Sequence, residues 1–506
     1  MIDIIDRQLD RITMYRLVLY YLIGLLGAAV ILSAANLLPY NPAALLYETG
    51  ILIGICWVIN VIFAWTFQAQ TNVESVYITA LILALIISPP ETILDVGFLV
   101  WAAIWAMASK YIVAINKKHL FNPAAFAVAL TAISIGQNAS WWVGTKWMLP
   151  LVLVGGVLLV RKLRRFHLVL SFLLTTVLST LVMSLYYQVD GGLTMRTSLL
   201  YSPLLFFAFV ILTEPLTMPH TKKLQVYYGA LVGFLFTPLL HLGSLYLTPE
   251  LAILGGNIFS YLVSPKAKLI LRLQEKVKIA PDIYDFIFVP TQKLAFAPGQ
   301  YMEWTLGHKH PDSRGNRRYF TLASSPTENT LRIGVKFYPD SSSYKRSMLS
   351  INNDSEIVAA QLAGDFVLPK NPTQKCVFIA GGIGITPFRS MIKYLLDTHQ
   401  RRPIVLFYTS KSIEDIVYKE IFDEARVQLG IKTIYSVTNQ QNLPASWNGY
   451  VGRITPQIIR KEVPDYADCT FYLSGPNAMV NSFRELLHEM NVPSDQIKMD
   501  FFAGFA

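Results

Sequence analysis

The chain has 506 residues, 53% of them hydrophobic, and a formal net charge of +10 at pH 7. A mean hydropathy of +0.41 is too apolar for a soluble protein of this length, which excludes an ordinary soluble enzyme. The three cysteines, Cys56, Cys376 and Cys469, lie far apart in the sequence, which excludes a disulfide framework and an iron–sulfur cluster held by this chain alone. We expect no metal site.

Hydrophobic residues are concentrated in the first half of the chain. Up to about Pro265 the sequence is a series of apolar runs, whereas from Lys266 charged residues recur every few positions and strand and helix patterns alternate. This change predicts a membrane unit over residues 1–265 and a soluble half after it. Residues 1–16 lack the features of a cleaved signal peptide, so we expect the first apolar run to be retained.

The membrane unit contains about ten apolar runs. A straight span needs roughly 20 residues, so we expect the runs of about 15 residues to be half-helices or to depend on tilt and neighbouring helices. The runs lie near residues 17–38, 43–67, 76–90, 95–115, 121–136, 147–160, 167–188, 198–213, 226–246 and 250–264.

Basic clusters follow every second run and predict the topology. They are Lys117–Lys118, Arg161–Arg165, Lys222–Lys223 and Lys266–Lys268, which all fall on one side if each run crosses once. The positive-inside bias makes that side the cytoplasm, with both termini and the soluble half there. Anionic membrane lipid then explains the positive net charge, and no nucleic-acid partner is needed.

Polar and helix-breaking residues recur at matching places in two halves of five runs. The third run ends near Pro89 and the eighth near Glu214, while the fifth opens at Asn122 and the tenth contains Asn257. Because five is odd, the two halves are inverted, and such interruptions point to a binding site at the membrane midplane that includes Asn122 and Glu214. The alternative is that Pro and Gly only end ordinary helices.

Two stretches, Lys117–Ala125 and Thr213–Thr217, resemble the membrane subunits shared by the sodium-pumping NADH:quinone reductase (its B subunit) and the Rnf complex (its D subunit). The resemblance covers most of residues 20–264. It implies ten membrane helices in inverted repeats and bound flavins. The family's Ser-Gly-Ala-Thr flavin-attachment motif is absent, and the corresponding place reads Trp141–Thr145. We therefore expect a noncovalent second flavin, FMN or riboflavin, between the half-helices.

Trp141 and Trp142 allow two interpretations. An indole pair is suited to stacking on an isoalloxazine ring, but it is more typical of an aromatic belt at the membrane interface, which is the arrangement that we expect. Thr145 has no independent support as an attachment site for a flavin.

In the soluble half, residues 284–288 alternate apolar and polar side chains as an antiparallel strand does. The same alternation places Arg318 and Phe320 on one face of a strand and Tyr319 and Thr321 on the other. Farther on, an apolar strand at 376–380 is followed by a glycine turn at 381–387 and a helix. This order builds a phosphate site from backbone amides and the helix dipole.

These motifs resemble the ferredoxin-NADP⁺ reductase superfamily from about Lys268 to Ala506. The resemblance implies an antiparallel β-barrel that binds FAD over residues 266–370 and an α/β parallel-sheet domain that binds NAD(P) over residues 371–506. A polytopic α-helical membrane unit followed by this reductase module is the fold that we expect.

The resemblance assigns FAD-binding roles. Arg318 is expected to pair with the pyrophosphate, for which a guanidinium fork is suited. Thr321 is expected to hydrogen-bond near the flavin N5, and Phe320 stands where the family has Tyr. Ser342 and Ser343 lie in the loop expected on the other side of the pyrophosphate, although a serine run is commonly just a turn. Further expected positions are Tyr319 at the cofactor, Phe505 covering the flavin ring and Asp500 as a nearby acid.

The NAD(P) assignments follow in the same way. Ser474, Gly475 and Pro476 occupy the family's Cys-Gly-Pro position beside the nicotinamide, and Ser474 joins Thr321 and Phe505 as a predicted catalytic residue. Ser410 and Lys411 are candidates for binding a 2′-phosphate, which favours NADPH and leaves NADH open. The glycine turn contributes Gly381, Gly382, Gly384, Thr386 and Pro387.

Together the two halves predict a membrane NAD(P)H dehydrogenase. Hydride would pass to FAD, and single electrons would cross a flavin-containing membrane unit to an extracytoplasmic flavinylated or haem protein, or to quinone. Alternatives are an NAD(P)H:quinone reductase without a relay, a redox-regulated ion transporter, and a haem-containing ferric reductase or oxidase. The last needs histidine pairs within helices, and only His167 and His241 lie near apolar runs.

Overall fold

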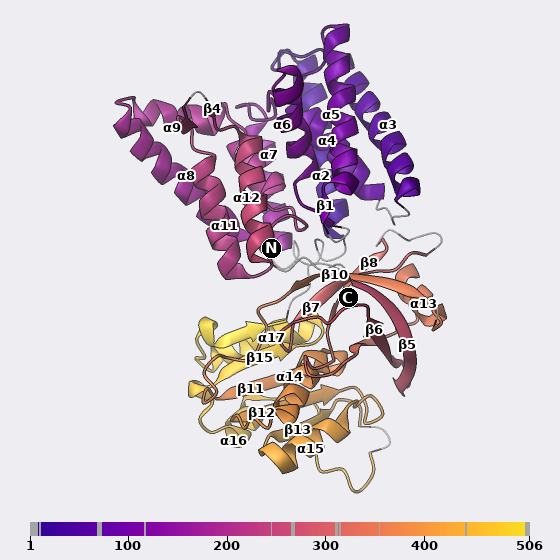
Figure 1. The fold of residues 1–506 in the computed structure, drawn as a ribbon. Coiled ribbons are helices and arrows are strands. Elements are labelled where there is room, and N and C mark those ends of the chain that lie inside the picture. The colour runs from indigo at the N-terminus through magenta and orange to yellow at the C-terminus, as the bar shows by residue number, and fades with distance from the viewer. Residues whose placement is uncertain are drawn as a thin grey trace. The chain divides into compact units, whose positions relative to one another are not determined.

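The computed structural model describes residues 9, 12–67, 73–115, 118–243, 245–264, 269–308, 312, 315–353, 355–440 and 443–500. The chain divides into two units, one helical and ending at residue 268, the other beginning at residue 269. We describe each unit by itself, with elements labelled as in Figure 1.

The helical unit consists of apolar helices joined by short connections. Its first five helices are α2 (Met14–Ala34), α3 (Pro42–Thr66), α4 (Val73–Ile86), α5 (Ile93–Ile112) and α6 (Pro123–Ile135). The later ones are α7 (Leu149–Leu163), α8 (Phe166–Tyr186), α9 (Gly191–Leu200), α10 (Leu204–Phe206) with the π-helical turn η1 (Phe207–Ile211), α11 (Lys222–Leu235) and α12 (Pro249–Val263).

Small hairpins precede two of these helices. Strands β1 (Ala114–Ile115) and β2 (Lys118–His119) pair antiparallel just before α6, and β3 (His241–Leu242) and β4 (Leu245–Tyr246) pair just before α12. The run expected at residues 198–213 is not one helix, because α9 and the segment Leu204–Ile211 meet at 63°. A π-turn at such a break is a common mark of a functional site.

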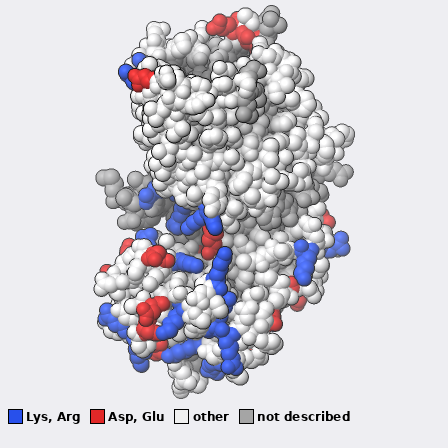
Figure 2. All heavy atoms as spheres, turned by 60° about the vertical axis from the view of Figure 1, so that its left-hand side comes forward, with Lys and Arg blue, Asp and Glu red and all other residues white. Residues whose placement is uncertain are grey.

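Three helices of the described chain, α2, α3 and α8, are long and apolar enough to cross a membrane, and the bent α9–η1 pair makes a fourth span if it is counted as one. Large apolar side chains point outward from them, including Trp65 with 83% exposure and Leu185 with 80%. Figure 2 shows one face of the helical unit with charged residues mainly at its edges, whereas charged residues of both signs are spread over the same view of the second unit. The exposed apolar surface is suited to contact with lipid.

The second unit begins with an antiparallel barrel. Its strand order is β8-β7-β10-β5-β6-β9. The Ala323 N–H donates to the Arg332 carbonyl oxygen at 2.8 Å, which joins the two outer strands of the order. The strands are β5 (Leu269–Ala280), β6 (Ile283–Pro290), β7 (Tyr301–Thr305), β8 (Arg317–Thr321), β9 (Leu331–Lys336) and β10 (Glu356–Ala363), and helix α13 (Ser343–Ser350) lies between β9 and β10.

A parallel six-stranded sheet follows in the order β14-β13-β12-β11-β15-β16. Its strands are β11 (Cys376–Gly381), β12 (Ile404–Ser410), β13 (Lys432–Val437), β14 (Tyr450–Val451), β15 (Thr470–Ser474) and β16 (Ile497–Met499). Helices α14 (Thr386–Asp397) and α15 (Lys419–Leu429) pack on one face, and α16 (Pro456–Glu462) and α17 (Asn477–Glu489) pack on the other. Both faces are covered, which explains the continuous apolar strands.

Buried polar contacts join the barrel to the parallel sheet. Asp285 on β6 has no exposed surface and accepts hydrogen bonds from Arg332 at 2.6 Å and from the Tyr418 hydroxyl before α15. Arg389 on α14 forms an ion pair with Glu328. Burial raises the pKa of Asp285, and its two donors oppose that shift. The expected order of an antiparallel barrel followed by a parallel α/β sheet is confirmed.

Candidate functional site

Arg318 and Phe320 lie on the same face of β8, as strand alternation predicts. The Arg318 guanidinium carbon is 5.0 Å from the ring centre of Tyr344, and the Phe320 ring centre is 6.2 Å from that of Tyr344. Tyr344 belongs to the first turn of α13, so a buried guanidinium lies against the side chain of a helix N-terminal turn. That pair is suited to a phosphate or pyrophosphate group.

Tyr319 lies on the opposite face of β8. Its hydroxyl donates to Glu303 at 2.9 Å, and Arg317 donates to the other carboxylate oxygen of Glu303 at 3.2 Å. Glu303 is directly opposite Tyr319 on β7 and is buried. The acid is thus paired on the face away from Tyr344.

The hydroxyls of the serine run are used within the protein. Ser342 caps α13 by accepting from the Lys345 N–H, and Ser341 accepts from the Tyr338 N–H at 2.9 Å. Ser343 accepts from the Asp312 N–H at 2.8 Å. The run therefore acts as a turn and a helix cap, and the Ser343 N–H at the start of α13 itself donates to Asp312 Oδ2 at 2.8 Å.

The glycine loop after β11 packs against the loop after β15. A Cβ on Gly384 would lie 2.5 Å from the Ser474 carbonyl oxygen and 2.6 Å from the Gly475 Cα. Gly382 has φ +53° and open space around it. The loop leads directly into α14, which begins Thr386-Pro387. The structure thus brings the two predicted nucleotide motifs together at the carboxyl ends of parallel strands, where such sheets bind ligands.

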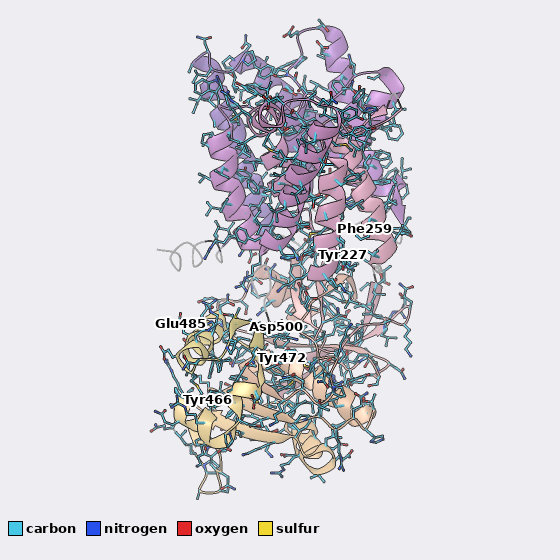
Figure 3. The ribbon with its side chains drawn as sticks, turned by 90° about the vertical axis from the view of Figure 1, so that its left-hand side faces the viewer. Tyr227, Phe259, Tyr466, Tyr472, Glu485 and Asp500 are labelled. Atoms are coloured by element: carbon cyan, nitrogen blue, oxygen red, sulfur yellow. The ribbon has the colours of Figure 1, made fainter. Side chains whose placement is uncertain are left out.

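Thr321, Ser474 and Asp500 meet at the junction of the barrel and the parallel sheet. The Ser474 hydroxyl donates to Asp500 Oδ2 at 3.1 Å, and the Thr321 side chain also hydrogen-bonds Asp500. Figure 3 shows Asp500 beside the end of the sheet. Burial raises the pKa of Asp500 to about 7, and the two hydroxyls oppose this shift. The carboxyl therefore changes charge near neutral pH, beside two hydroxyls that are themselves buried.

The remaining predicted positions differ in accessibility. Ser410 at the end of β12 is buried, whereas Lys411 is exposed, so only Lys411 presents its side chain to a ligand from solution. Phe505 lies outside the described residues.

In the helical unit, the structure brings Asn122 and Glu214 together. Asn122 Nδ2 donates to Glu214 Oε2 at 2.8 Å, and Thr217 donates to the same oxygen at 3.1 Å. His119 Nε2 lies 3.7 Å from Glu214 Oε1. The Asn122 N–H donates to Asn257 Oδ1 at 2.8 Å. Residues from three separate segments thus form one polar cluster.

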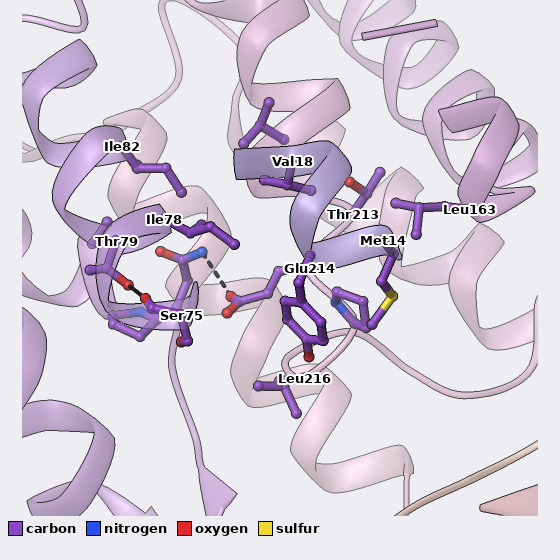
Figure 4. A pocket seen from close by; sticks show the side chains of 16 residues that line it. Met14, Val18, Ser75, Ile78, Thr79, Ile82, Leu163, Thr213, Glu214 and Leu216 are labelled. Atoms are coloured by element: carbon purple, nitrogen blue, oxygen red, sulfur yellow. Dashed lines mark hydrogen bonds between the residues drawn. The ribbon is translucent and has the colours of Figure 1, made fainter. Parts of the chain in front are cut away.

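A pocket with about 690 Å³ of empty space, including space open to solvent, lies beside this cluster. Figure 4 shows Glu214 and Thr213 facing the apolar side chains of Val18, Ile78 and Ile82. The cavity combines apolar walls with one polar end, which is the usual composition of a small-molecule site.

Trp141 and Trp142 are buried and end helix α4. Trp142 Nε1 donates to the carbonyl oxygens of Ala84 at 2.9 Å and Ile87 at 2.8 Å, and the Trp141 N–H donates to the Ile86 carbonyl at 2.8 Å. These bonds satisfy the last carbonyls of a 14-residue helix, which water cannot do inside a bilayer. The expectation of a lipid-facing aromatic belt at this pair is wrong.

Several polar residues of these sites were missed by the sequence reasoning. They are the junction residues Asp285, Arg332 and Tyr418, and His119 and Thr217 beside Glu214. Asp285 is a charged residue within an alternating apolar strand, and His119 and Thr217 lie in the two stretches that carry the membrane-subunit resemblance, so each of these had a signal in the sequence. His167 and His241 hydrogen-bond to Gln225 and Tyr187, which does not resemble a haem-ligand pair.

Two family models match separate segments of the chain. Residues 143–267 match the NQR2, RnfD, RnfE family, and residues 378–485 match the oxidoreductase NAD-binding domain. Each half of the chain therefore contains a segment that matches a known family. The chain is therefore a multi-pass membrane protein with an oxidoreductase module, and both predicted resemblances are confirmed.

The module is similar to reductase parts of known proteins. It is 27% identical over 239 residues to a flavohemoprotein of Oceanobacillus iheyensis, a match to 45% of this chain and 57% of that protein. A glycine betaine monooxygenase reductase subunit of Pseudomonas aeruginosa is 24% identical, over 41% of this chain and 56% of that one. The chain thus spans less than two thirds of either relative. The FAD/NAD-binding domain of a Vibrio cholerae nitric oxide dioxygenase is 18% identical, with a TM-score of 0.41, over 46% of this chain and 98% of that domain.

Proposed function

We propose that the protein is a membrane NAD(P)H dehydrogenase that passes electrons from a reductase module to a flavin-containing helical unit. The observation that carries the proposal is the meeting of Thr321, Ser474 and Asp500 beside the glycine loop. This is the place where a nicotinamide held by the parallel sheet and a flavin held by the barrel would face each other.

The residues present fit FAD and a nicotinamide nucleotide. Arg318 and the start of α13 would hold the FAD pyrophosphate, and Thr321 lies three residues, about 10 Å, farther along β8. The lack of a side chain at Gly384 lets the glycine loop pack against the loop at Ser474 and Gly475, which keeps both nucleotide motifs together. FAD, when bound, accepts hydride and gives up single electrons. Asp500 is placed to stabilise the positive charge that develops on a nicotinamide as hydride leaves.

In the helical unit, a noncovalent flavin, FMN or riboflavin, is proposed for the pocket beside Asn122 and Glu214. Apolar walls suit the ring system, and the polar cluster offers donors and acceptors at one end. The matching hairpins before α6 and α12 support ten helices arranged as inverted repeats, with the site between the two halves.

The proposed location is the cell's cytoplasmic membrane, with the reductase module in the cytoplasm. Basic residues at the end of α7 and the start of α11 support this side, since lysine and arginine are enriched in cytoplasmic loops. The clusters at Lys117 and at Lys266–Lys268 lie wholly or partly outside the described residues. The proposed acceptor is an extracytoplasmic flavinylated or haem protein, with quinone as the other chemical class.

Replacing Arg318 with Ala tests the reductase assignment. Loss of a buried charge-assisted contact to the pyrophosphate should weaken FAD binding by about 3 kcal/mol, roughly a hundredfold, and abolish NAD(P)H oxidation. The matched control is Arg317→Ala, because Arg317 contacts Glu303 on the other face. Full FAD content and an unchanged oxidation rate in purified Arg318→Ala would contradict the proposal.

A further inference from the structure

Glu48 is a carboxylic acid enclosed within the helical unit. It lies on the buried face of α3, and its side chain has no exposed surface. Among the described residues, neither of its carboxylate oxygens has a hydrogen-bond partner. A carboxylate in this condition has lost its water without gaining any replacement.

Three other glutamates of the same unit have a hydrogen-bond or ion-pair partner. Glu74 forms an ion pair with Arg16 at 2.9 Å, Glu214 accepts from Asn122, and Glu250 accepts from Trp141 Nε1 at 3.0 Å. The helical unit therefore supplies hydrogen-bond donors to these three glutamates, whereas Glu48 has no hydrogen-bond donor among the described residues.

Charges on the neighbouring helices do not compensate Glu48. Helix α3 packs against α2, α4 and α5, whose described charged residues are Arg16, Glu74, Asp95 and Lys110. Arg16 and Glu74 pair with each other, Asp95 caps α5 with Thr92, and Lys110 donates to the side chains of α4. Glu48 is also the seventh residue of α3. It therefore lies beyond the first turn, which is the part of a helix where the dipole favours an anion. The neutral acid is the form that this environment favours.

Polar residues recur beyond Glu48 on the buried face of α3. Cys56 and Asn60 lie on this face, with the apolar Leu52 between Glu48 and Cys56, so that the three polar residues span about 18 Å of the helix. Asn60 accepts from the Tyr111 hydroxyl at 2.9 Å. Lys110, the residue before Tyr111, donates to two hydroxyls of α4 that also line the pocket beside Glu214. Polar groups therefore occur both on the buried face of α3 and beside the pocket.

We propose that Glu48 is an exchangeable proton-binding site of the helical unit. In the arrangement described here it is a neutral carboxylic acid. On release, its O–H bond breaks, the electron pair stays on the carboxylate, and the proton passes to water. On uptake the same steps run in reverse, and no oxidant or reductant takes part.

Infrared spectroscopy of the full-length protein in membranes distinguishes the two forms. The spectrum of the wild type minus that of Glu48→Gln should contain the carbonyl band of a protonated carboxylic acid, and the band should shift when water is replaced by D₂O. The control, Glu74→Gln, should reveal carboxylate bands, because Glu74 is paired with Arg16. Carboxylate bands for Glu48, or an acid band that does not shift in D₂O, would overturn the proposal.

A second measurement needs no variant. Dicyclohexylcarbodiimide reacts with protonated carboxyls in apolar surroundings, so peptide mass spectrometry of treated wild-type membranes should find the adduct on Glu48 and none on Glu74. An adduct on Glu74 with none on Glu48 would contradict the assignment.

A link between Glu48 and electron transfer would rest on the proposed function. Reduction by NAD(P)H should then change the Glu48 band in parallel with the flavin absorbance. An unchanged band with reduced flavins would separate Glu48 from electron transfer, whereas flavins that NAD(P)H does not reduce would contradict the proposed function instead.

Discussion

In the reductase module, short loops at the carboxyl ends of parallel strands hold the polar groups, whereas in the helical unit the polar groups lie where apolar helices are interrupted. Ser474 and Gly384 belong to compact motifs set by backbone geometry. Asn122, Glu214 and Asn257 come from segments far apart in the sequence and meet through their side chains.

This difference reflects the solvent of each unit. Water can satisfy backbone groups around the reductase loops, so a glycine turn is enough to expose amides to a ligand. In a bilayer each interrupted helix needs protein donors, as Trp142 provides at the end of α4. A ligand site in the helical unit is therefore tied to the packing of several helices, and changes there are expected to affect both binding and structure.

The largest expected effect comes from Gly384→Ala. The added Cβ would lie 2.5 Å from the Ser474 carbonyl oxygen, so the two nucleotide loops must separate. We expect kcat/KM for NAD(P)H to fall at least about a hundredfold, or about 3 kcal/mol, while FAD stays bound. Gly382→Ala is the matched control, because its Cβ enters open space and costs only about 1 kcal/mol for φ +53°. Equal losses in both variants would contradict the close-packing argument.

A smaller effect, about tenfold, is expected from Asp500→Asn. With its pKa raised to about 7, Asp500 is neutral in acid and becomes an anion as the pH passes 7. The anion favours the positive charge developing on the nicotinamide, so flavin reduction should accelerate by about tenfold across this pH range. Stopped-flow reduction of the variant should be flat with pH, at the slower rate. A pH step that persists in the variant would assign it to another group.

Lys411→Ala should have the smallest effect. An exposed lysine contributes up to about 1 kcal/mol to binding an anion, so KM for NADPH should rise about threefold to fivefold and KM for NADH should stay constant. Steady-state kinetics with both nucleotides measure this directly. An equal change for NADH would remove Lys411 from any 2′-phosphate site.

The main contacts of the reductase module could be predicted because its motifs are local. Alternation along a strand places Arg318 and Phe320 on the same face, and the strand–loop–helix order places the glycine turn directly before α14. The contact of Asp285 with Tyr418 could not be predicted, because it joins residues 133 positions apart. The hydroxyls of Ser342 and Ser343 were expected to face a ligand, yet they cap α13 and bind a neighbouring loop.

In the helical unit, apolar runs predicted where helices lie but not which side of each faces lipid. Trp141 and Trp142 illustrate this, since nothing in an apolar stretch distinguishes an outward indole from one that ends a half-helix. The interruptions near Asn122 and Glu214 were more informative, because a polar residue at membrane depth needs a partner. Asn122 is that partner for Glu214, since Asn122 Nδ2 donates to Glu214 Oε2 at 2.8 Å.

Flavin analysis of the purified full-length protein tests the central proposal most directly. Acid extraction and chromatography should yield FAD together with a second, extractable FMN or riboflavin, and Glu214→Gln should lower the second flavin while FAD is retained. In-gel fluorescence of the denatured wild-type chain should be absent. FAD alone in the wild type would contradict the relay, and would mean that electrons leave the reductase module for quinone or a partner protein without passing through a flavin in the helical unit.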